Sequence, residues 1–145
     1  MSDLVKKENP PNIEEIQARF PSIKGQKGII YTYDKVIYNP DGMPLTSELV
    51  AHEMTHIKQQ AEHKGGVKGW WKQYLEDDGF RFAEELEAYS RQYIVFCDSV
   101  KDRNQRATYL FFLAKHLSSP QYGSIISTTD AQNILRQTTK KYTKK

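Results

Sequence analysis

Two histidines and a glutamate near residue 52 form the pattern in this sequence with the clearest chemical use. The segment reads His52-Glu53-Met54-Thr55-His56, and we expect it inside a helix that starts near Thr46 and ends near Lys64. Histidines four residues apart lie about 40° apart around a helix and one turn apart along it. Both imidazoles can therefore bind one zinc ion, with Zn–N distances of about 2.0–2.1 Å. Glu53 then lies beside the metal, where it can take a proton from metal-bound water.

A zinc site of this kind needs a third protein ligand and an open fourth position for water. The third histidine of metzincins would stand at position 62, after a glycine at position 59, but this chain has Glu62 and Gln59. His63 lies about 10 Å farther along the helix axis than His56, so we expect a helix-end histidine outside the site. Cys97 follows an apolar run, and we expect it in the core.

The acidic cluster Glu84-Glu85-Leu86-Glu87 offers the remaining ligand. On a helix from about Phe80 to Val100, Glu85 borders the apolar face, whereas Glu84 and Glu87 lie on the far side, where charges usually face solvent. An acid on the buried side needs a cation. We therefore predict that Glu85 is the third ligand, and the alternative is that it pairs with a buried arginine or lysine.

The pattern of apolar residues, caps and breakers around these ligands predicts a mainly α fold (α+β) of one domain, residues 1–145. We expect an N-terminal extension over 1–27, a core over 28–135 and a basic tail over 136–145. Gly28–Tyr33 and Val36–Tyr38 are predicted to form a small β-hairpin. The helical bundle is expected from helices near residues 12–19, 46–64, 70–76, 80–100, 102–117 and 130–139, the last with a capping box at Thr129 and Gln132.

Composition excludes several classes of protein. The formal net charge of +3 comes from the last ten residues, which hold five basic residues and no acid, so we expect a solvated tail and no nucleic-acid partner. A single cysteine excludes an intramolecular disulfide. No apolar run approaches the roughly 20 residues of a membrane span, and no secretory signal is evident. We therefore expect a cytoplasmic protein with no membrane span.

The two motifs together resemble the gluzincins, zinc metallopeptidases with two helical histidines and a downstream glutamate. The segment Glu85-Leu86-Glu87-Ala88 is similar to the E-x-x-A-D pattern of the subgroup that cleaves peptides in or near membranes. The chain also resembles small HExxH proteins of bacteria and phages over residues 28–93. It departs from the subgroup at Tyr89, which stands where that pattern has aspartate, so the resemblance assigns no second carboxylate to orient a histidine.

This resemblance implies a zincin-like domain that hydrolyses peptide or protein substrates with Zn²⁺ on His52, His56 and Glu85, and with Glu53 as general base. Tyr89, one turn from Glu85, is the preferred oxyanion donor, ahead of His116 and Tyr122. In such sites the substrate lies extended along a strand, here Gly28–Tyr33. The same ligands would accept other divalent metals.

The alternative is a zinc-stabilised binding or structural module without catalysis. Glu53, which metal binding does not need, favours the enzyme. A nucleic-acid-binding protein that works through its lysine-rich tail is a third possibility, and it predicts binding that weakens steeply with salt.

Overall fold

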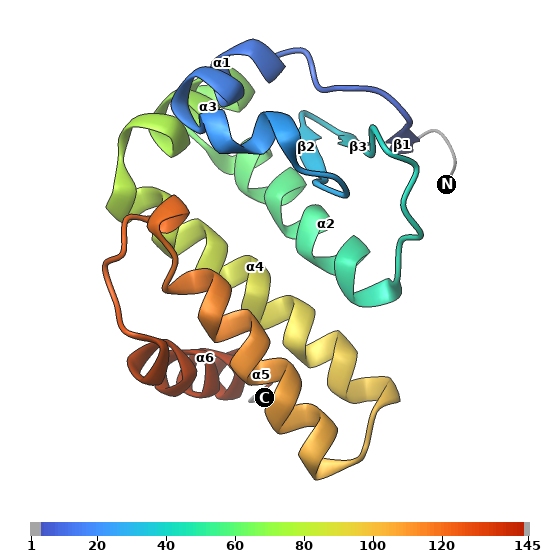
Figure 1. Ribbon diagram of the computed structural model, residues 1–145, viewed down its shortest axis with the longest axis vertical. Coiled ribbons are helices and arrows are strands. Elements are labelled where there is room, and N and C mark those ends of the chain that lie inside the picture. Colours follow the sequence, from blue (N-terminus) through green and yellow to red (C-terminus); the bar gives the residue numbers. More distant parts are fainter. Residues whose placement is uncertain (1–3, 144–145) are drawn as a thin grey trace.

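Helices make up most of the structure, as the sequence predicted, and a small sheet lies beside them (Figure 1). The computed structural model describes residues 4–143. The helices are α1 (Ile13–Arg19), α2 (Ser47–Glu62), α3 (Gly66–Glu76), α4 (Asp78–Ser99), α5 (Arg103–Leu117) and α6 (Thr128–Thr143), with 3₁₀ segments η2 (Pro21–Gly25) and η3 (Pro120–Tyr122). The strands are β1 (Val5–Lys6), β2 (Tyr31–Tyr33) and β3 (Val36–Tyr38). None of the described helices is both long enough and apolar enough to span a membrane.

The predicted hairpin is confirmed, although its first strand is shorter than expected. β2 and β3 pair antiparallel around a two-residue turn, in which Asp34 takes a left-handed conformation (φ 59°) that aspartate tolerates. β1 pairs parallel with β3, which gives the strand order β1-β3-β2. The sequence did not predict β1, because two residues are too few to show an alternating pattern.

Two apolar clusters build the core, and α2 and α4 pack together between them. Side chains of α1, η2 and α3 form the first cluster: Ile16, Phe20, Ile23, Trp70, Trp71 and Tyr74. Side chains of α5 and α6 form the second: Leu110, Leu113, Ala114, Leu117, Ala131 and Leu135. In Figure 1, α1, α3 and the sheet lie at the top and α5 and α6 at the bottom, so α2 and α4 run through the middle of the molecule.

The N-terminal region predicted as an extension is part of this core. Ile16, Phe20 and Ile23 are buried against the aromatic residues of α3. The buried Arg81 guanidinium lies 5.2 Å from the centre of the Phe20 ring, and its N–H groups donate to the carbonyls of Tyr74 and Gln121. The expectation of a region outside the core over 1–27 is wrong from α1 onward, because three apolar side chains of this short segment face α3.

The described part of the basic tail is exposed to solvent, as expected, but it is helical. The final helix continues to Thr143 and includes the exposed basic residues Arg136, Lys140 and Lys141. The guanidinium of Arg91 lies 3.9 Å from the centre of the Tyr142 ring and holds this end of α6 against α4. Lys144 and Lys145 lie outside the described residues.

Polar side chains fix where the site-bearing helices begin. The predicted cap of α2 is confirmed, since the Thr46 hydroxyl accepts from the Leu49 amide. Asp77 caps α4 in the same way. Ser127, rather than the predicted Thr129, caps α6. Asn12, which precedes α1, is buried and its side chain makes no capping hydrogen bond.

Candidate metal centre

The two histidines of α2 face the same side and lie buried. His52 is 7% exposed and His56 is 5% exposed. Their Nε2 atoms approach to 3.2 Å, as expected for residues one turn apart on one helix face. The helix therefore presents two imidazole nitrogens at one point, which lies toward α4.

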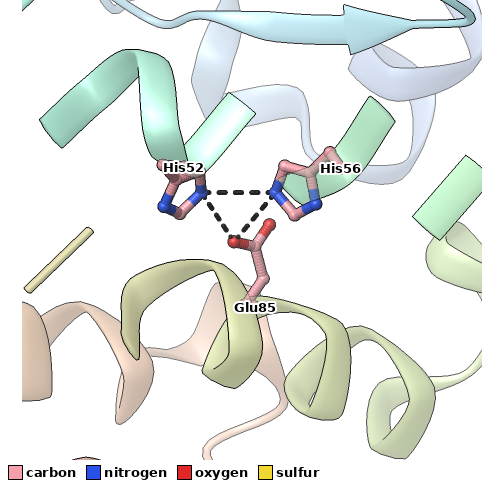
Figure 2. Close-up of side chains that lie close together, drawn as sticks. All are labelled: His52, His56 and Glu85. Carbon is pink, nitrogen blue, oxygen red and sulfur yellow. Dashed lines mark hydrogen bonds and ion pairs between the residues drawn. The ribbon is translucent and has the colours of Figure 1, made fainter. Parts of the chain in front are cut away.

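Glu85 reaches that point from α4, as Figure 2 shows. Its Oε1 lies 3.0 Å from His52 Nε2 and 3.3 Å from His56 Nε2, and the residue is 4% exposed. Within residues 4–143, this is the one group of three or more histidine, cysteine or acidic side chains whose ligand atoms could hold a metal ion. The structure thus brings together the three ligands predicted from the sequence.

The Gln59 side chain fixes which nitrogen of His56 faces the site. Its Nε2 donates to the Glu84 carbonyl at 3.0 Å and to the Glu87 carboxylate at 2.8 Å. Because both partners can only accept, the amide oxygen faces His56 and lies 2.8 Å from Nδ1. His56 therefore donates from Nδ1 and turns the lone pair of Nε2 toward Glu85.

Gln92 is the corresponding amide partner of His52. Its Oε1 lies 2.8 Å from His52 Nδ1, and its Nε2 donates to the Tyr109 hydroxyl at 2.6 Å. Gln92 is buried and lies two turns after Glu85 on the same face of α4. Both histidines are thus oriented by neutral amides instead of the carboxylate that the family resemblance left unassigned.

This arrangement places three acceptors together and requires a positive charge among them. In the metal-free chain a proton supplies it. Burial alone would lower the pKa of His56, but the charge and hydrogen bond of Glu85, together with Glu53 and Gln59, outweigh burial and raise that pKa to about 9. Burial alone would raise the pKa of Glu85, and the charge on His56 lowers it.

The residues fit a divalent cation in place of that proton. Four tetrahedral ligands at about 2.0–2.1 Å from one ion lie about 3.3–3.4 Å from one another, which is close to the separations of 3.0–3.3 Å among these atoms. Glu85 Oε1 is buried, and its polar contacts among the described residues are with the two histidines alone. Two imidazoles and one carboxylate are a donor set suited to zinc and to other divalent metals.

The second carboxylate oxygen of Glu85 accepts from the Tyr74 hydroxyl at 2.6 Å. Burial and the charge of Glu85 raise the pKa of Tyr74 well above its ordinary value, so this hydroxyl stays protonated and can donate. Among the described residues, Glu85 does not pair with a buried arginine or lysine, which was the alternative. The buried Arg81 uses its guanidinium on Asp78 and two backbone carbonyls instead.

Glu53 follows His52 on α2, about 100° around the helix, and contacts the hairpin. Its Oε1 accepts from the Thr32 hydroxyl at 2.7 Å. Gln60 ties α2 to this strand as well, because its amide donates to the Thr32 carbonyl and accepts from the Asp34 amide. The hairpin therefore fixes the position of the Glu53 carboxylate.

A cavity of about 390 Å³ connects these groups. It is lined by the three candidate ligands and by Glu53, and apolar side chains from η2, the segment before β2 and α5 complete its wall. Trp70 and Trp71 also line it and are buried, as expected of packing or cleft-wall residues. Its size falls within the range of about 300–1,000 Å³ typical of small-ligand sites.

The three candidate oxyanion donors all line this cavity. The Tyr89 ring packs edge-on against His52, with 4.6 Å between ring centres, and its hydroxyl lies 3.3 Å from that of Tyr122. Burial and the charge of Glu85 raise the pKa of Tyr89, so its hydroxyl remains a donor. His116 is exposed and stands behind Tyr89, with 6.3 Å between ring centres.

The neighbouring acids are not the solvent-facing residues that helical phase predicted. Glu84 and Glu87 are partly buried, and they accept hydrogen bonds from Trp70 and Gln59. The expectation is wrong because α2 and α3 both pack on that side of α4. His63, by contrast, lies outside the group as expected and bonds to Gln73 and the Gly65 amide.

The strand edge expected to receive a substrate is closed in part. β2 is an edge strand, but Thr32 is buried and its carbonyl accepts from Trp71 and Gln60. Pairing with another extended segment at Thr32 is therefore blocked. The partly exposed residues 28–30, which are not in a strand, also line the cavity.

Sequence reasoning missed the residues that orient the ligands. Gln59 had a local signal, because it lies three residues after His56 and so on a neighbouring position of the helix surface. Gln92 shares the face of Glu85. Tyr74 and Thr32 come from other elements, and no spacing along the chain indicates their contacts.

Comparison of the chain with protein-family models, with curated proteins and with solved structures finds no match.

We predict that Glu85→Ala lowers zinc affinity by more than the roughly 10–100-fold expected for loss of an outer hydrogen bond, because it removes a ligand. Glu84→Ala and Glu87→Ala should have smaller effects. Competition with a chelating dye measures all three affinities against the unaltered chain, which should bind about one zinc. Equal losses in the three variants would contradict the assignment of Glu85.

Gln59→Leu should lower zinc affinity roughly 10–100-fold, because His56 loses the acceptor that orients it. The same dye competition applies. Gln60→Leu is the matched control, since Gln60 is buried on the same helix but contacts the hairpin and neither histidine. It should lower the free energy of unfolding and leave zinc affinity within about twofold. An unchanged affinity in Gln59→Leu would show that this amide does not hold the ligand.

Proposed function

We propose that the chain is a zinc-dependent metallopeptidase with a minimal zincin-like site. The observation that carries the proposal is the position of Glu53. Its carboxylate lines the same cavity as His52, His56 and Glu85, although metal binding does not need it. A carboxylate next to a three-ligand site has a ready use as a base in hydrolysis.

When bound, zinc would lower the pKa of a water molecule and polarise the carbonyl of the substrate. His52, His56 and Glu85 would hold the metal, and three protein ligands are typical of catalytic zinc sites that also bind water. Gln59 and Gln92 keep both Nε2 lone pairs directed at the site, and Tyr74 holds the Glu85 carboxylate.

Glu53 would take the proton from the attacking water as its oxygen bonds to the carbonyl carbon. The carboxylate would then pass this proton to the nitrogen as the C–N bond breaks, which leaves a carboxylic acid and an amine. The bond from Thr32 to Oε1 holds Glu53 in place through both transfers. Tyr89, protonated and packed against His52, is suited to donate a hydrogen bond to the developing oxyanion.

Glu53→Gln tests this function. We expect the variant to keep its zinc, since Glu53 is not a ligand, and to lose at least about 10²–10⁴-fold in peptide hydrolysis with the loss of its base. Hydrolysis of a library of internally quenched peptides by the zinc-loaded protein is the measurement, and metal analysis of the same samples checks the loading.

Glu62→Gln, at the exposed end of α2, serves as its control and should match the unaltered chain. Activity in Glu53→Gln equal to that of the control would contradict the role of Glu53. Zinc binding without hydrolysis of any peptide by the unaltered chain would favour the alternative, a zinc-stabilised binding or structural module.

Tyr89→Phe should lower kcat by about 10²–10³-fold with unchanged zinc affinity, because it removes a donor to the oxyanion and no ligand. Steady-state kinetics on a cleaved peptide separates kcat from KM. The control is Tyr93→Phe, one turn farther along α4 and outside the cavity, which should leave kcat unchanged. A kcat equal to that of the control would reject Tyr89 as the donor.

A further inference from the structure

The wall of the cavity beside the candidate metal centre is apolar. Besides the polar groups described above, it is formed mainly by aliphatic and aromatic side chains from four parts of the fold: Ile23, Ile29, Ile30, Leu49, Phe112 and Leu113. Phe112 lines the cavity and is also 52% exposed. His116 and Gln121 also line the cavity and are exposed, so its exposed lining on α5 and η3 includes both apolar and polar side chains.

The charged side chains that line the cavity also limit which ligands it can accept. Among the described residues that line the cavity there is no lysine, arginine or aspartate. Each of its two carboxylates accepts a hydrogen bond from a neutral hydroxyl, Glu53 from Thr32 and Glu85 from Tyr74. With a divalent cation bound, the two glutamates would balance its charge.

A charged group of a ligand would therefore enter this cavity without a counter-charge. A terminal carboxylate would find no lysine or arginine, and burial lowers the pKa of the His116 imidazole. A terminal ammonium would find only two carboxylates, whose charge a bound divalent cation would already balance. Burial of an unpaired charge is strongly unfavourable. The cavity thus disfavours both ends of a peptide and all charged side chains.

We propose, on the basis of the proposed peptidase function, that this cavity selects internal peptide bonds next to a large apolar side chain, which makes the protein an endopeptidase. A leucine or phenylalanine side chain would be buried against the apolar wall. Complete burial of such a side chain corresponds to a gain of roughly 10- to 150-fold in binding or in kcat/KM.

Leu49 is the residue of the wall best placed to determine this preference. It lies on α2 one turn before His52 and Glu53, lines the cavity and is partly exposed. A cation at this position would give an acidic side chain the partner that it lacks. Leu49→Arg should therefore reverse the preference toward aspartate.

The experiment uses octapeptides with acetylated and amidated ends that differ in one central residue, which is Leu, Phe, Ala, Lys or Asp. Their affinity for the zinc-loaded Glu53→Gln chain is measured by titration calorimetry, and their kcat/KM with the unaltered chain by chromatography. We expect Leu and Phe to exceed Ala by roughly 10- to 150-fold in both measurements, with Asp and Lys weakest. Free ends should not improve cleavage.

Leu49→Arg and Met54→Arg are then compared in the same assays. Met54 lies on the same helix, is 41% exposed and does not line the cavity, so its variant should keep the preference for Leu and Phe. Zinc content and circular dichroism check that Leu49→Arg is folded. If Leu49→Arg did not fold, equal binding of all peptides by the zinc-loaded Glu53→Gln chain would still overturn the inference.

The outcomes separate the inference from the proposed function. Cleavage of all peptides at similar rates, or faster cleavage of peptides with free ends, would overturn the inference and leave a peptidase. Selective binding without cleavage would support the cavity's selectivity and contradict the peptidase. Neither binding nor cleavage would overturn both.

Discussion

The site depends on one constraint. Three buried acceptor atoms, from His52, His56 and Glu85, are held close together. Each imidazole of α2 is turned so that a lone pair faces inward, and Glu85 adds a negative charge from α4. Such a group is stable only with a cation or a proton among its atoms. Gln59, Gln92 and Tyr74 prevent the three ligands from turning away.

A few hydrogen bonds between elements far apart in sequence hold the site together. Gln60 and Trp71 both donate to the Thr32 carbonyl, which holds the hairpin against α2 and sets Glu53 beside the ligands. Arg81, buried on α4, joins α3 to the loop that carries Tyr122 through two backbone carbonyls. The ligands come from two helices, but their geometry depends on α3, the hairpin and η3.

The part of the site that could be predicted from the sequence is the part that depends on local spacing along a helix. His52 and His56 share a face because they are four residues apart, and helical phase separated Glu85 from its acidic neighbours. The contacts of Thr32 and Tyr74 join elements far apart in sequence, so no spacing could indicate them. Ile16 and Phe20 were expected outside the core for a different reason. A short helix has too few turns for its apolar face to be recognised.

We expect His52, His56 and Glu85 to hold one divalent metal ion. Crystals of the zinc-loaded protein, measured at the zinc absorption edge, would show whether they do. One anomalous peak per chain is expected, at about 2.0–2.2 Å from His52 Nε2, His56 Nε2 and Glu85 Oε1. A peak bound elsewhere, or none between these three atoms in a chain that contains zinc, would contradict it.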